Sequence, residues 1–125
     1  MLTGAVAELL IGVTRDAQFG LTLTIGAGGV LVELLDDAAS LLLPAARDDV
    51  ARALASLKVS KLLQGYRGQP KGDIDAALDA VMAVTRFAEA HWDSLEELDV
   101  NPLLVLPQGE GAVAVDALIR IVPAP

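Results

Sequence analysis

Two oxygen-bearing side chains near the end of the chain could hold a metal ion. Asn101 lies in an apolar run that starts at Leu98, Asp116 lies in a second run rich in Val, Leu and Ile, and a turn-forming segment, 107–111, separates them. This pattern predicts a β-hairpin, and if its loop has four residues, 107–110, Asn101 stands opposite Asp116. Directly opposed residues of an antiparallel pair have Cβ atoms about 4.5–5.5 Å apart on one face. An amide and a carboxylate oxygen at that separation suit Mg²⁺ carrying the phosphates of a nucleotide.

The same two residues also have a purely structural interpretation. Asn-Pro is a common way to begin a strand or turn, and an aspartate late in a strand is often a solvated edge residue. A slip of one residue in the pairing would send Asp116 to the opposite face. The metal interpretation therefore depends on the register of the hairpin.

A glycine cluster at 26–29 precedes an apolar run, 30–35, that we expect to be a strand carrying Glu33. Because no Gly-Lys-Ser or Gly-Lys-Thr follows and a strand comes next, the P-loop and dinucleotide-binding mechanisms lack their geometry. The backbone of Gly28 and Gly29 could approach a ligand as only glycine allows, or it could simply form a tight turn. A carboxylate at Glu33 requires a cationic or metal partner, or a place at the sheet edge.

The remaining elements follow from the hydrophobic pattern. Strands are expected over 5–13, 21–25 and 39–43, and helices over 48–57 and 74–88, the second capped near Asp73. Together with the last hairpin, this order predicts an α+β fold, a mixed or antiparallel sheet with helices packed mainly on one face. With 125 residues, the chain is expected to be a single domain, 1–125.

Composition excludes several classes of partner. The formal net charge is −8, which argues against binding to nucleic acid or to an anionic membrane, although six of the nine cationic residues lie between positions 47 and 71. The longest uncharged stretch, 17–32, is interrupted by glycines, so no membrane span is expected. The chain has no cysteine, which fits a reducing, cytoplasmic setting.

Four motifs together resemble a known family. They are Glu-Leu-Leu-Ile-Gly-Val-Thr-Arg-Asp-Ala-Gln-Phe-Gly at 8–20, Gly-Ala-Gly-Gly-Val-Leu-Val-Glu at 26–33, Leu-Gln-Gly-Tyr-Arg-Gly at 63–68, and Leu-Asp-Val-Asn-Pro-Leu at 98–103 with Val-Asp at 115–116. In this order they resemble the C-terminal lobe of the ATP-grasp domain of ADP-forming (NDP-forming) acyl-CoA synthetases, including acetyl-CoA synthetases. The succinyl-CoA synthetase β subunit is a more distant relative. One departure is Leu21, where the family commonly has proline.

The resemblance implies roles for particular residues. Asn101 and Asp116 match the positions that hold Mg²⁺ on the phosphates of ATP or ADP. Glu8 matches a position at the nucleotide site, and Arg15 lies in the segment that approaches the phosphates. Three further residues match a family motif near the active centre: Gly28, Gly29 and Glu33. The resemblance assigns them no chemical step.

The resemblance also implies a reaction and missing parts. The family converts a carboxylate, ATP and CoA into acyl-CoA, ADP and phosphate through an acyl phosphate and a phosphohistidine. The N-terminal ATP-grasp lobe, the CoA-binding domain or subunit and the phosphorylated histidine are absent, so we expect a fragment that is inactive alone and needs these as partners; an oligomer is compatible with the sequence. The alternative is a non-catalytic regulatory or assembly module, such as the ligase-like region of some bacterial protein lysine acetyltransferases.

Overall fold

The computed structural model describes residues 4–28 and 37–122. The strand expected over 30–35, together with Gly29 and Glu33, lies outside the described residues.

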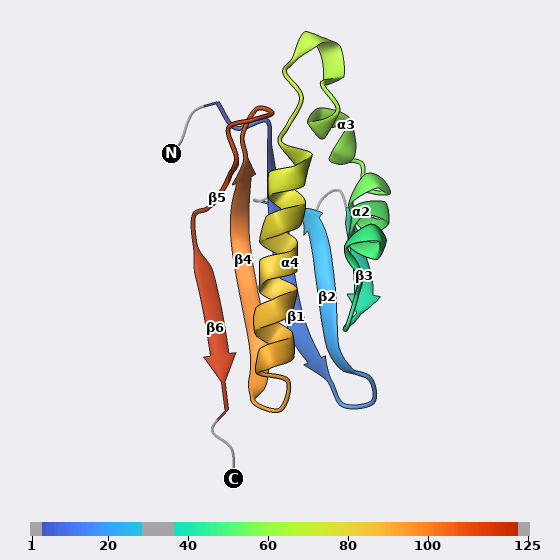
Figure 1. Cartoon of the computed structure of the whole chain (residues 1–125), viewed down its shortest axis with the longest axis vertical. Coiled ribbons are helices and arrows are strands. Elements are labelled where there is room, and N and C mark those ends of the chain that lie inside the picture. Colours follow the sequence, from blue (N-terminus) through green and yellow to red (C-terminus); the bar gives the residue numbers. More distant parts are fainter. Residues whose placement is uncertain (1–3, 29–36, 123–125) are drawn as a thin grey trace.

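The described strands form one antiparallel sheet of six strands (Figure 1). The hydrogen-bonded order is β3-β2-β1-β4-β5, and β6 pairs with β4 beyond the end of β5. The strands are β1 (Ala7–Asp16), β2 (Gly20–Ala27), β3 (Ala38–Leu42), β4 (Leu95–Val105), β5 (Ala112–Ala114) and β6 (Ala117–Ile121). The predicted α+β class and the antiparallel sheet are confirmed.

The helices lie on one side of this sheet. They are α2 (Arg47–Ala55), the short α3 (Ser60–Leu63), the 3-10 turn η1 (Tyr66–Gly68) and the long α4 (Ile74–Ala90). In Figure 1, α4 lies in front of β1 and runs along it between β4 and β2, while α2 lies beside β3. The predicted pair of helices is confirmed, and α3 with η1 lies between them, in a stretch for which the sequence predicts neither helix nor strand.

The core lies between α4 and the sheet. Alternate residues of β1 and β2 are completely or almost completely buried, because the side chains of a strand point to its two faces in turn. These residues are Leu9, Ile11, Val13, Leu21, Leu23 and Ile25. They pack with the apolar stripe of α4 that includes Ala77, Val81 and Ala88. The opposite side of the sheet, which we call the open face, carries the other set of alternate residues.

The C-terminal hairpin has the predicted register. Leu103 pairs with Ala114 and Leu104 with Val113. Continuing this register, the Asn101 N–H donates to the Asp116 carbonyl oxygen at 3.2 Å. Asn101 and Asp116 therefore stand opposite each other, as the four-residue loop predicts.

A β-bulge, which the pattern did not predict, lies at this point of β4. Leu9 pairs with Leu103 but Ile11 pairs with Val100, so Asn101 and Pro102 together oppose Leu10. The extra residue shifts the alternation of β4 by one position. As a result Val100 and Leu103 both face the core, and Asn101 is left on the open face.

Candidate metal and nucleotide site

Polar side chains of β4 gather on the open face. Leu98 and Val100 are buried in the core, so the alternating residues Glu97, Asp99 and Asn101 point to the other side. The register then places Gly12 beside Asp99. It also places Asp116 beside Asn101, in the interval between β5 and β6. The strand pairing thus brings two carboxylates and an amide to one region of the sheet.

Asp116 and Asn101 differ in their surroundings. Asp116 is exposed, and its Oδ1 accepts the backbone N–H of Ala117 at 2.9 Å, which holds the carboxylate close to the strand. Asn101 is half-buried. A carboxylate and an amide supply the hard oxygen ligands that Mg²⁺ prefers, while phosphates and water complete its coordination in nucleotide sites. The donor set therefore fits Mg²⁺ bound to a nucleotide.

Asp99 belongs to this region; the sequence indicates it as a negative charge close to the expected metal position, but not as a ligand. Burial raises the pKa of the Asp99 carboxyl above its usual value, and the negative charges of Glu97 and Asp116 raise that pKa further. This carboxylate lies next to Gly12, where a Cβ would be 3.6 Å from Asp99 Oδ1, an ordinary van der Waals contact. The available signal was spacing, because Asp99 precedes Asn101 by two residues and shares its face of the strand.

The described residues do not form a complete metal cage by themselves. Among residues 4–28 and 37–122, no group of three or more His, Cys, Asp or Glu side chains is arranged to hold a metal ion. A site of one carboxylate and one amide takes its remaining ligands from outside the chain, as Mg²⁺ sites on nucleotides commonly do.

Glu8 and Gly28 lie together near one end of the open face. Glu8 is exposed on β1 opposite Leu104, and its carbonyl oxygen accepts the N–H of Gly28 at 2.8 Å. A Cβ on Gly28 would lie only 2.9 Å from the carbonyl carbon and oxygen of Leu9. Gly28 is therefore required for the close approach of two backbone segments, whatever it does toward a ligand.

Arg15 lies on the other face. It occupies an odd position of β1, like the buried Val13, and its Nε and Nη2 donate to the carbonyl oxygen of Leu95 at 3.0 and 2.7 Å. The same guanidinium also donates to the carbonyl oxygen of Trp92. The structure does not bring Arg15 together with Asn101 and Asp116. Arg15 instead ties β1 to the loop after α4.

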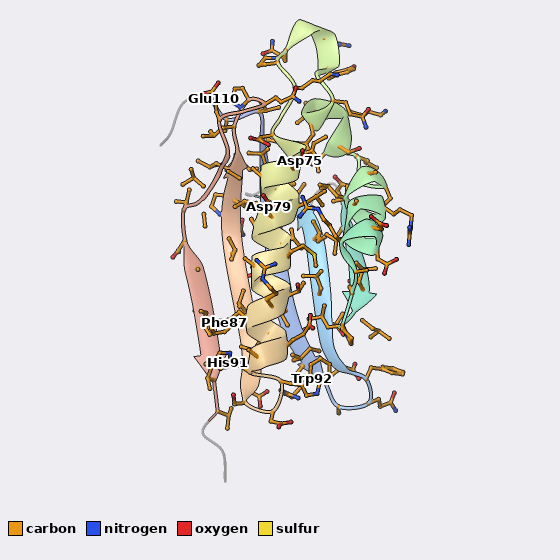
Figure 2. All side chains as sticks on the ribbon, viewed as in Figure 1. Asp75, Asp79, Phe87, His91, Trp92 and Glu110 are labelled. Carbon is orange, nitrogen blue, oxygen red and sulfur yellow. The ribbon has the colours of Figure 1, made fainter. Side chains whose placement is uncertain are left out.

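Two aromatic contacts on other elements are structural. His91, near the end of α4, stacks on Phe87 with ring centroids 4.2 Å apart, and its Nδ1 lies 2.9 Å from the Phe87 carbonyl oxygen (Figure 2). In η1, the Arg67 guanidinium lies 5.1 Å from the centre of the Tyr66 ring. The Phe87–His91 pair does not face Asn101 or Asp116, because it lies at the end of α4, on the opposite side of the sheet.

Sequence comparison decides the family. Residues 1–121 match the profile of the ATP-grasp domain family. The chain belongs to the ATP-grasp family. This ATP-grasp chain is 38% identical over 112 residues to the beta subunit of ADP-forming acetate–CoA ligase II of Pyrococcus furiosus, which covers 90% of the chain and 48% of that subunit. It is 39% identical over 112 residues to the ADP-forming acetate–CoA ligase of Methanocaldococcus jannaschii, covering 90% of the chain and 16% of that protein.

Solved ATP-grasp structures agree with this result. A Pyrococcus horikoshii protein superposes with a TM-score of 0.90 at 36% identity, over 99% of this chain and 52% of that one. The acetyl-coenzyme A synthetase 1 of Ca. Korarchaeum cryptofilum, in complex with coenzyme A and Mg-AMPPCP, superposes with a TM-score of 0.86 at 36% identity, over 97% and 55% of the two chains. The ATP-grasp chain spans about half the length of these two structures and of the Pyrococcus furiosus subunit, and 16% of the Methanocaldococcus jannaschii protein. No helix in the described part is long and apolar enough to cross a membrane.

Proposed function

We propose that this chain is the C-terminal, nucleotide-binding and Mg²⁺-binding lobe of an ADP-forming acyl-CoA synthetase that acts on acetate or a related carboxylate. In this proposal, Asn101 and Asp116 hold Mg²⁺ on the phosphates of ATP or ADP. The observation that carries it is the hairpin register, in which the Asn101 N–H donates to the Asp116 carbonyl oxygen at 3.2 Å and the two residues share one face.

The chain's residues would act on phosphoryl transfer by position and charge. When bound, Mg²⁺ neutralises the charge that builds up on the transferred phosphoryl group. Asn101 and Asp116 orient the ion relative to the sheet, and Asp99 adds negative charge beside them, so a cation is favoured there over an anion. Glu8, exposed on β1, supplies a polar boundary at the glycine end of the open face.

The rest of the machinery is proposed to lie in other parts of the protein or in other subunits. The chain matches about half of the Pyrococcus furiosus beta subunit, and a site between two ATP-grasp lobes requires the other lobe. We therefore expect no acyl-CoA synthesis by this chain alone. The N-terminal ATP-grasp lobe and a CoA-binding domain or subunit are the expected partners.

Paramagnetic broadening of backbone amide signals by Mn²⁺, a substitute for Mg²⁺, tests the metal site in the chain itself. As Mn²⁺ and ADP are added, we expect the amide signals around Asn101 and Asp116 to broaden at lower Mn²⁺ concentrations than those of α2. Asp116→Ala should weaken this binding by roughly tenfold or more, the scale of losses at metal sites. Asp48→Ala, which removes an exposed carboxylate on α2, is the matched control.

Equal broadening in Asp116→Ala and in the unmodified chain would contradict the proposed metal site. If the assembly with its other lobe also failed to bind Mg-nucleotide, the ligase proposal would be withdrawn in favour of a non-catalytic regulatory or assembly module.

A further inference from the structure

Strand β6 is an exposed edge of the sheet. It pairs with β4 on one side, every residue from Ala117 to Ile121 is exposed, and Figure 1 shows no helix over it. Apolar side chains are exposed on both faces of the sheet at this edge. The exposed apolar residues here are Val113, Val115, Leu118, Ile119, Ile121 and Val122. A long, apolar, uncovered edge readily pairs with another strand.

The free backbone groups of β6 can be identified from the hydrogen bonds at its two ends. The Asp116 carbonyl oxygen accepts the Asn101 N–H, and the Val122 N–H donates to the Ser94 carbonyl oxygen. The even-numbered residues of this segment therefore direct their N–H and C=O groups toward β4. Because these groups alternate along a strand, those of Ala117, Ile119 and Ile121 point away from the sheet. These three alternate residues can therefore form backbone hydrogen bonds with a new antiparallel strand.

We propose that β6 is a self-association edge, at which two copies of this chain pair antiparallel about a twofold axis passing between their Ile119 residues. Ile119 then faces Ile119 of the second copy, and Ala117 faces Ile121 of the second copy, so all outward backbone groups are bonded. The contact is the same patch on both copies and closes as a dimer without growing into a filament. With the axis perpendicular to the sheet, both open faces point to the same side.

The charge pattern fits a second copy. Residues 117–125 contain no acidic residue although the whole chain has a net charge of −8. Arg120 forms an ion pair with Glu97 at 3.2 Å and would face Leu118 of the second copy, so no like charges are directly opposed. Leu118 in turn pairs with Asp99 on β4, which brings the second copy's Arg120 into the same cross-strand row as an acidic residue.

A disulfide test reads out the register directly, because the chain has no cysteine of its own. Directly opposed residues of a hydrogen-bonded antiparallel pair have Cα atoms about 5.5 Å apart, within the range a disulfide spans. Ile119→Cys should therefore form a disulfide-linked dimer quickly on mild oxidation. Two control variants should cross-link far more slowly. Leu118→Cys would face Arg120 of the second copy, and Phe19→Cys is 61% exposed but lies far from β6 in the β1–β2 turn.

Sedimentation at protein concentrations on the order of 1 to 100 μM tests reversible association. We expect the unmodified chain to shift from monomer to dimer over this range, Ile119→Lys to weaken the dimer by about tenfold or more, and Phe19→Lys to leave it unchanged. A monomer at every concentration, or equal cross-linking of the three cysteine variants, would overturn the proposal and leave the edge to another segment of a longer protein. Ile119 faces away from the Asn101 and Asp116 side of the sheet, so this result is independent of the metal test.

Discussion

The bulge at Asn101 and Pro102 determines which side chains of β4 reach the open face. Before it, Leu98 and Val100 face the core; after it, Leu103 and Val105 do so. Without the extra residue, an uninterrupted alternation would turn either Asn101 or Leu103 to the wrong side. Bulges are often found next to functional sites because they re-aim a side chain in this way.

Arg15 is expected to stabilise the fold through the loop after α4. Arg15→Met keeps the aliphatic stem but removes the donors to the Leu95 and Trp92 carbonyl oxygens, which should lower the free energy of unfolding by about 1.5–3 kcal/mol. Urea unfolding measures this loss, with Arg86→Met, at an exposed position of α4, as the control. An unchanged unfolding midpoint combined with weaker Mn²⁺-ADP binding would instead support the role at the phosphates that the family resemblance implies.

Two glycines on the open face should respond differently to the same methyl group. Gly28→Ala forces a Cβ to within 2.9 Å of the Leu9 backbone, so we expect a loss of about 1–3 kcal/mol of stability. At Gly12 the nearest atom is a side-chain oxygen at 3.6 Å, and Gly12→Ala should be neutral or stabilising by up to about 0.5–1 kcal/mol. Thermal unfolding distinguishes the two, and equal effects would show that the sheet relaxes around Gly28.

At the level of elements, local sequence patterns predicted those features that depend only on residues close together in the chain. The hairpin register followed from two apolar runs and a loop of fixed length, and the start of α4 followed from Asp73 before an apolar stripe. The bulge and the side of Arg15 depend on how β1 and β4 pair across most of the chain, which a linear pattern does not contain. For Arg15 a partial signal existed, since it shares its alternation with Leu9, Ile11 and Val13.

Asp73 joins two elements and should make their stability depend on pH. Its carboxylate accepts the N–H of Ala76 at the start of α4 and those of Gly109 and Gly111 in the β4–β5 turn. The hydrogen bonds from Ala76 and then Gly111 lower the pKa of Asp73 below its usual value. Because the unfolded chain then binds the proton more readily, the stabilisation is complete above the unfolded pKa and is lost as the pH falls through the folded pKa.

Asp73→Ala is therefore expected to lower the urea midpoint at neutral pH and to have much less effect at a pH below both values. Asp75→Ala serves as the control. It lies two residues further along, in the first turn of α4, and removes a carboxylate that makes no side-chain hydrogen bond among the described residues. A stability difference between Asp73→Ala and the unmodified chain that stayed constant with pH would exclude the carboxylate as its origin.

At the scale of the whole molecule, charge is unevenly distributed. Six of nine cationic residues lie between positions 47 and 71, while most of the 17 acidic residues lie elsewhere, including the open face. The net charge of −8 opposes the association of copies at neutral pH without excluding the β6 dimer, and that repulsion disappears near the isoelectric point of about 4.4. The apolar β6 edge is then the surface least protected against association.

Solubility near pH 4.4 should consequently depend on β6 more than on total charge. Ile119→Glu and Phe19→Glu change the net charge equally, at residues that are 50% and 61% exposed. Ile119→Glu should raise the soluble concentration near the isoelectric point well above that of Phe19→Glu, because an acidic side chain on the edge opposes strand pairing. Turbidity measured across the acid range checks this, and equal solubility of the two variants would mean that lost charge, and not the β6 edge, controls association of the whole molecule.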